Sequence, residues 1–141
     1  MNRITYWLTA NTIYNIQSPS LYRLCGEVLC ARLPHALRRR LPRRHRKYHE
    51  ALYKLSAHLG ARAVPMGGAG DGMRGSLLAL RDGRRVAVVC APHASASAAR
   101  HWGQLRQERE WRVSIDLYDV GVLLDDPRLS RQHIVLKGWG W

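Results

Sequence analysis

Apolar side chains recur at helical spacing through the first sixty residues, and two amphipathic helices are predicted there. The first spans about 19–33, since Ser18 can cap a helix and Pro19 is tolerated in a first turn. Its apolar positions are Leu21, Leu24, Cys25, Val28 and Leu29. The second spans about 45–59 and ends at Gly60. It is expected to bury Tyr48, Leu52, Leu55 and Leu59.

Beyond residue 60 the apolar residues gather in short runs, which are typical of strands. Residues 62–66 predict a weak strand that enters a glycine-rich loop at 67–72, and residues 84–90 (RRVAVVC) predict a buried strand. Residues 76–80 allow two interpretations. They form either a helical turn or a strand that a hairpin turn at Asp82-Gly83 joins to 84–90.

The last third of the chain predicts one helix followed by strands. Ser95 or Ser97 caps a helix that reaches about Glu108. Its inward-facing residues are Ala98, Ala99, Trp102 and Leu105. Strands are predicted at 113–118, 120–124 and 133–137.

Apolar and polar residues alternate in the strand predicted at 113–118. Val113, Ile115 and Leu117 would face the core, so Asp116 is expected on the opposite face, as a carboxylate that faces solvent or lies at an edge. The following Asp125-Asp126-Pro127 is expected to form a turn. The elements together predict a single α/β domain, with helices over 1–60 and an α/β part over 61–141 that ends in an antiparallel strand pair.

Positive charge is concentrated before the strands begin. The 141 residues include 23 Lys+Arg and 10 Asp+Glu, a net charge of +13. Through residue 62 there are 12 basic and 2 acidic residues, and after it 11 and 8. The densest stretch is the basic run, whose charged members are Arg38, Arg39, Arg40, Arg43, Arg44, Arg46 and Lys47. The run predicts salt-dependent binding to nucleic acid or another acidic surface. Because arginine outnumbers lysine 20 to 3, a general bias toward arginine is an alternative explanation.

No membrane segment or export signal is predicted. No apolar run approaches the ~18 residues that a membrane span needs. The first residues lack a cationic leader followed by an apolar stretch. The three cysteines, Cys25, Cys30 and Cys90, include no CxxC pair, so buried thiols in a reducing, cytoplasmic location are expected.

Two cysteines and two histidines approach the spacing of a zinc site. The pattern is Cys25-x4-Cys30-x14-His45-x3-His49, and Cys2His2 is a tetrahedral ligand set. Cys25 and Cys30, however, fall five positions apart on one predicted helix, so they are not expected to be neighbours on its surface. An arginine-rich linker also replaces the short hairpin of a zinc finger. No metal site is therefore predicted.

Several segments together resemble a known family. The stretch from Val113-Ser114-Ile115-Asp116-Leu117 to Leu124, followed by RQHIVLK, resembles the last third of class I S-adenosylmethionine (SAM) dependent methyltransferases of the Bacteroidetes type, which read VTVSIDLF, GLLF and EHFVI there. Residues Ile16–Tyr22 resemble their IHSPFVY, and Tyr48–Leu55 resembles the helix before their first core strand. The similarity touches both ends of the chain.

The resemblance implies a reduced Rossmann-like methyltransferase sheet whose glycine loop holds SAM. The glycines at the matching positions are Gly67, Gly68, Gly70 and Gly72. The segment for the family's second to fourth strands is missing, and with it the acid that would hold the ribose hydroxyls. Where the family reads VVDDIHWS, Cys90 and Ala91 replace both acids. His93 is kept, but without an acidic partner it is expected on a surface loop.

Three functions are compatible with these observations. A methyltransferase-like protein that has lost catalysis is favoured, and no catalytic residue is assigned. The alternatives are an active SAM-dependent methyltransferase of reduced size and a nucleic-acid-binding protein that uses the basic run. Since the loss of strands from the middle of a sheet would leave apolar edges, self-association is also expected.

Overall fold

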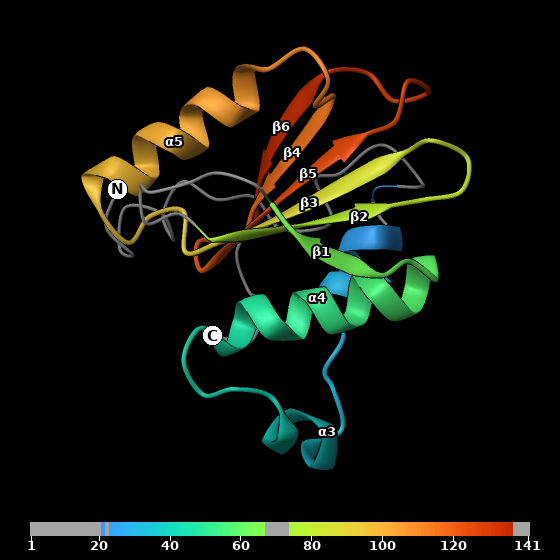
Figure 1. Cartoon of the computed structure of the whole chain (residues 1–141), viewed down its shortest axis with the longest axis vertical. Helices are drawn as coiled ribbons and strands as arrows, with labels where there is room; N and C mark the ends of the chain where they lie inside the picture. Colours follow the sequence, from blue (N-terminus) through green and yellow to red (C-terminus); the bar gives the residue numbers. More distant parts are fainter. Residues whose placement is uncertain (1–20, 22, 67–73, 137–141) are drawn as a thin grey trace.

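The computed structural model describes residues 21, 23–66 and 74–136. In these residues helices precede the strands, and one further helix lies between strands (Figure 1). The helices are the π-helix η2 (Leu24–Leu29) and the α-helices α3 (His35–Arg40), α4 (Arg46–Leu59) and α5 (Ala96–Gln107). The strands are β1 (Ala63–Pro65), β2 (Gly75–Ala79), β3 (Arg85–Cys90), β4 (Val113–Asp116), β5 (Val120–Asp125) and β6 (Gln132–Val135). The predicted α/β class is confirmed.

The six strands form one mixed sheet in the order β1-β2-β3-β5-β4-β6. Neighbouring strands are antiparallel except for β4 and β6, which are parallel. Following these pairings across the sheet, β1, β3, β4 and β6 all point the same way. Their carboxyl ends therefore share one edge of the sheet, called here the carboxyl edge.

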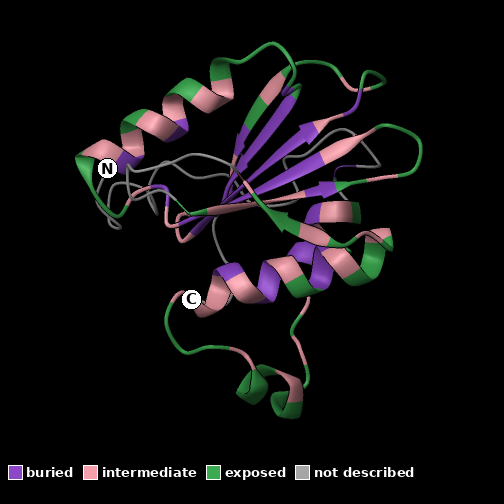
Figure 2. Cartoon of the chain, viewed as in Figure 1, coloured by how far each residue is buried: buried purple, intermediate pink, exposed green. Residues whose placement is uncertain are grey.

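Both faces of the sheet are covered. Helices η2 and α4 pack on one face and α5 on the other (Figure 1). In β3, Val86 and Val88 join the core under η2 and α4, whereas Ala87 and Val89 pack with Trp102 of α5. A strand buried on both sides needs an apolar residue at every position, which explains the uninterrupted apolar run from Val86 to Cys90. Figure 2 shows the resulting concentration of buried residues in the central strands.

Local signals placed two of the helices correctly. Helix α4 ends at Gly60, whose φ of 62° lies in the left-handed region that favours glycine. Helix α5 begins after Ser95, whose Oγ accepts a hydrogen bond from the Ala98 amide at 3.0 Å. The helix expected over 19–33 is in part a π-helix, closed by a bond from the Cys30 amide to the Cys25 carbonyl at 2.8 Å.

The segment between β1 and β3 is a strand, so the helical turn considered for residues 76–80 is wrong and the hairpin alternative is correct. Strand β2 pairs antiparallel with β3 along its whole length. At the turn, Asp82 Oδ1 accepts a hydrogen bond from the Arg84 amide at 3.0 Å, and Gly83 has a φ of 90°. The turn chemistry of this Asp-Gly pair outweighs the weak strand propensity of GSLLA.

The expected antiparallel strand pair near the end of the chain is β4 with β5. Strand β6 then adds parallel to β4 instead of extending that pair. Strand β2 lies between β1 and β3, so β1, which precedes the glycine loop, and β3, which leads into the segment of Cys90 and Ala91, are not direct neighbours. Strands β1 and β6 are the edges of the described sheet, and self-association through exposed edges stays a prediction. No described helix is long and apolar enough to span a membrane.

Candidate functional site

A polar cluster lies at the carboxyl edge of the sheet, where ligands bind in many open α/β folds. Asp116 is the last residue of β4, and His93 lies in the loop between β3 and α5. Trp102 reaches the cluster from α5. Three consecutive elements of the chain thus contribute side chains to one place, called here the Asp116 cluster.

The Asp116 carboxylate accepts hydrogen bonds from three groups. Its Oδ2 is 2.6 Å from His93 Nε2 and 3.2 Å from Trp102 Nε1, and its Oδ1 accepts from the Tyr118 amide at 2.9 Å. The residue is only 3% exposed. The His93 ring stacks on the Tyr118 ring with centroids 5.1 Å apart. A carboxylate acceptor fixes the proton of His93 on Nε2, so this imidazole is held in one orientation.

Two expectations for this region are wrong. Asp116 does not face solvent, and His93 does have an acidic partner, because its side chain is 9% exposed and bonded to Asp116. The alternation in β4 separates two faces, as predicted, but α5 covers the face that carries Asp116 and Ser114. A polar face of a strand reaches solvent only when no other element packs on it.

A second polar group lies on the same face of β4. Ser114 Oγ is 2.6 Å from His133 Nδ1, and His133 Nε2 is 2.8 Å from the Arg106 guanidinium. Burial, and next the Arg106 charge, lower the pKa of His133. Since a guanidinium can only donate, Nε2 accepts and the ring proton of neutral His133 lies on Nδ1, directed at Ser114. His133 therefore cannot take a proton from Ser114, so this pair is not arranged as a nucleophile and its base.

The role that the geometry gives the Asp116 carboxylate is to orient the groups that donate hydrogen bonds to it. Both carboxylate oxygens are occupied by donors of the chain itself, and those donors belong to the β3–α5 loop, to α5 and to the residues after β4. The carboxylate thereby ties α5 to the sheet. The sequence contained one signal for this arrangement: a single carboxylate, Asp116, among the apolar residues of the stretch 113–117, where a buried charge needs partners.

The structure positions only some of the residues that the resemblance singled out. The predicted cofactor glycines, Gly67, Gly68, Gly70 and Gly72, lie outside the described residues. Cys90 and Ala91 lie at the carboxyl edge, as expected. Burial raises the pKa of the Cys90 thiol to about 11, so it is neither a carboxylate substitute nor a thiolate nucleophile at neutral pH.

The basic run occupies α3, the loop after it and the first turn of α4. Arg38, Arg39 and Arg40 form the last turn of α3, which stands apart from the sheet in Figure 1. Five arginines of the run are exposed, namely Arg38, Arg39, Arg40, Arg43 and Arg44, while Arg46 and Lys47 are half-buried. Arg38 pairs with Glu50 at 2.7 Å. The other four exposed arginines make no ion pair with a described residue.

A comparison with protein-family models, with curated proteins and with solved structures gives no match. The resemblance to class I methyltransferases therefore stays a prediction from the segments that carry it.

The cysteines and histidines of the considered zinc pattern are distributed over η2, its end and the start of α4. In the π-helix the amide of Cys30 bonds to the carbonyl of Cys25, so the two residues are closer than an α-helix would place them. Burial raises the pKa of Cys25 to about 12. All three thiols are free; Cys25 and Cys90 are buried as predicted, and Cys30 is half-buried. Among the described residues no group of three metal-ligating side chains is present.

Proposed function

We propose that the chain binds nucleic acid through the basic run. The observation that supports this proposal is the exposure of five arginines on α3 and the loop after it, next to each other in the chain. Guanidinium groups bind phosphate oxygens through charge-assisted and often bidentate hydrogen bonds. The net charge of +13 adds long-range attraction for a polyanion.

The same surface favours contact with the phosphate backbone over recognition of bases. Tyr48 is the aromatic residue that follows the run, and it is buried, with its hydroxyl 2.6 Å from Ser76 Oγ. Sequence-tolerant stacking on bases needs an exposed aromatic ring. The basic run itself contains no Phe, Tyr or Trp, and the exposed Tyr53 lies six residues beyond its end. The proposed binding is therefore electrostatic and independent of base sequence.

Replacement of the five exposed arginines by glutamine tests this proposal. One variant combines the five substitutions Arg38→Gln, Arg39→Gln, Arg40→Gln, Arg43→Gln and Arg44→Gln. Its affinity for a tRNA-sized RNA is measured by fluorescence anisotropy at several salt concentrations. If each arginine neutralises one phosphate, the slope of log K against log salt becomes shallower by up to roughly four. Affinity at low salt is expected to fall on the order of a hundredfold or more.

A matched variant separates position from charge. Arg62, Arg81, Arg100, Arg109 and Arg112 are also exposed, and their replacement by glutamine removes the same formal charge outside the run. This control is expected to retain most of the affinity and most of the salt slope. Equal losses in the two variants would show that only the net charge matters, and unchanged binding in the first variant would exclude the basic run.

We propose, as a second function, a methyltransferase-like protein with a reduced Rossmann-like sheet that has lost catalysis. The β3–α5–β4 unit, with two strands of the same direction joined by a helix, and the antiparallel β5 support the relationship. The engagement of both Asp116 oxygens supports the loss, since the acid kept at the carboxyl edge already serves the fold. Cys90 and Ala91 supply no carboxylate for a cationic, ribose-bearing ligand.

Calorimetry with SAM tests the second proposal. Titration into the full chain is expected to show no saturable heat at up to about 1 mM ligand, because SAM carries a sulfonium cation and the matching acids are absent. Saturable binding in the micromolar range that is lost in Gly67→Val would contradict the proposal. That result would favour instead the active, shortened methyltransferase.

A further inference from the structure

A cavity of about 620 Å3 lies at the edge of the sheet opposite the Asp116 cluster. One wall comes from η2 and the carboxyl-terminal half of α4, and the other from the start of β3 and the end of β5. Cavities of roughly 300–1,000 Å3 with an apolar lining and a few polar groups are the usual form of small-molecule sites.

The apolar part of the lining is aliphatic. It consists of seven leucines and Val86, and none of the described lining residues is Phe, Tyr or Trp. Planar ligands such as nucleosides are held largely by stacking on aromatic rings. A lining of branched aliphatic side chains instead matches a flexible hydrocarbon chain, which gains free energy in proportion to the apolar area it removes from water.

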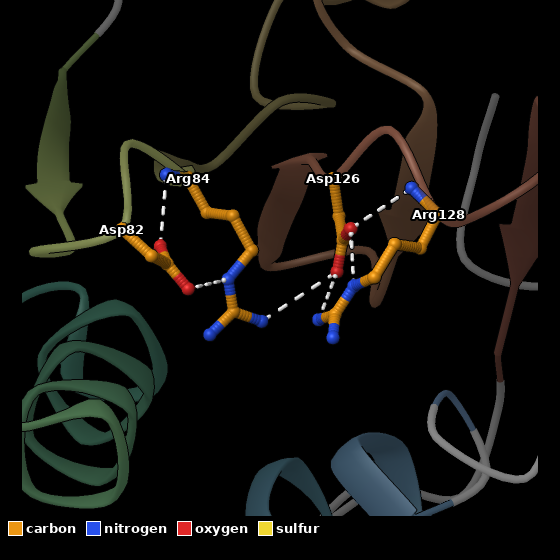
Figure 3. A network of polar contacts seen from close by, with 4 residues as sticks. All are labelled: Asp82, Arg84, Asp126 and Arg128. Carbon is orange, nitrogen blue, oxygen red and sulfur yellow. Dashed lines mark hydrogen bonds and ion pairs between the residues drawn. The ribbon is translucent and has the colours of Figure 1, made fainter.

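Three charged side chains of the lining, those of Arg84, Asp126 and Arg128, form a network of polar contacts with Asp82 (Figure 3). The Arg128 side chain binds Asp126 through two contacts, Nε to Oδ1 at 3.0 Å and Nη2 to Oδ2 at 2.9 Å. Arg84 binds Asp82 at 2.6 Å and approaches Asp126 at 3.5 Å. Figure 3 shows both guanidinium groups extending toward the side of α4 and η2. The hydrogen bonds from Arg128 hold the pKa of Asp126 at about 2, so this carboxylate stays ionised.

The side chains around the cavity carry an excess of positive charge. The charged residues of the lining are four arginines and three acids, namely Arg23, Arg84, Arg85, Arg128, Glu27, Asp125 and Asp126. Arg84, Arg85 and Arg128 are paired with acids. Neither Arg23 nor Glu27 makes an ion pair with another residue in the described part of the chain. A ligand with a negative group would balance the additional arginine of the lining.

We propose that this cavity binds an aliphatic molecule with an anionic head, its hydrocarbon chain among the leucines and its head near Arg23 and Arg84. This site is separate from the basic run and from the carboxyl edge, so it holds or fails independently of nucleic-acid binding. A carboxylate and a phosphate head share the required chemistry, and they would come from a free fatty acid and from a phospholipid-type ligand respectively.

Calorimetry on the full chain with three ligands of equal chain length, below their micelle concentrations, tests the proposal. Decanoate or decyl phosphate is expected to bind at least tenfold more tightly than decyltrimethylammonium. The anion that binds more tightly shows whether the head is the carboxylate of a fatty acid or the phosphate of a phospholipid-type ligand. Arg23→Gln is expected to weaken anion binding about tenfold, the contribution of one charge-assisted hydrogen bond. Arg62→Gln, an exposed arginine outside the cavity, should leave the affinity unchanged.

A cavity-filling variant tests the position of the hydrocarbon chain. Leu59→Trp places a larger side chain in the lining and is expected to weaken binding of every ligand at least tenfold. If circular dichroism shows that this variant is unfolded, Arg23→Gln still tests the proposal. Arg23 is exposed, so its replacement is not expected to disturb the core. Three results would each overturn the proposal. They are equal affinity for the anionic and cationic ligands, no binding of either anion, and unchanged decanoate affinity in a folded Leu59→Trp variant.

Discussion

Replacing Asp116 by alanine is expected to lower the free energy of unfolding by about 3 kcal/mol or more. The substitution leaves the donors His93 Nε2, Trp102 Nε1 and the Tyr118 amide without their acceptor in a buried place. Each unsatisfied buried donor costs about 1–3 kcal/mol, and the sum is reduced where water enters the space vacated. Urea unfolding at neutral pH, followed by far-ultraviolet circular dichroism, measures the change.

Trp102→Phe provides the control for this prediction. It removes one donor of the cluster while keeping an aromatic ring, and it is expected to cost about 1 kcal/mol through the lost hydrogen bond in addition to lost packing. In the Asp116→Ala background the hydrogen-bond part disappears, so the two substitutions should couple by about 1 kcal/mol. Additive effects, or an Asp116→Ala variant as stable as the parent chain, would contradict the role assigned to the carboxylate.

The elements that the sequence predicted well are those with local signals. Gly60 ends α4 and Ser95 begins α5 through bonds within a few residues of each position. Strand β3 was predictable because its apolar run has the length and composition of a strand buried on both faces. Strand β2 was ambiguous, since GSLLA lacks β-branched residues and becomes a strand by pairing with β1 and β3.

The partners of Asp116 could not be predicted from periodicity. Alternation in β4 gives two faces, but which face another element covers depends on how α5 docks on the sheet. That docking brings together residues 93, 102 and 116, which lie on different elements, up to 23 positions apart in the chain. The cavity at the opposite edge was equally hidden, because its lining extends from Leu21 to Leu129.

The docking of α5 depends on a glycine whose importance the sequence did not reveal. Gly121 lies in β5, and a Cβ atom added there would lie 2.5 Å from Trp102 Cη2 and 2.6 Å from Cζ3. The indole is 2% exposed and packs against Ala87, Val89 and Leu123. A ring enclosed in this way has little space into which it can move.

Gly121→Ala is therefore expected to destabilise the fold by about 2–3 kcal/mol, in the upper part of the range for overpacking a core. The methyl group must displace Trp102, which also strains the hydrogen bond from its indole to Asp116 at 3.2 Å. Thermal and urea unfolding of the variant measure the loss. A near-ultraviolet circular dichroism spectrum reports whether the environment of the tryptophans has changed with it.

Gly103→Ala is the matched control, since it adds the same methyl group one residue after Trp102. A Cβ at Gly103 meets no atom within 4 Å, and the residue lies inside α5, where alanine is favoured over glycine by about 1 kcal/mol. The control is thus expected to stabilise the chain slightly while Gly121→Ala destabilises it. Combining Gly121→Ala with Trp102→Leu, which shortens the opposing side chain, should make the Gly121 substitution cost less than it does alone. A Gly121→Ala variant that unfolds like the parent chain would show that α5 does not rest on β5 at this position.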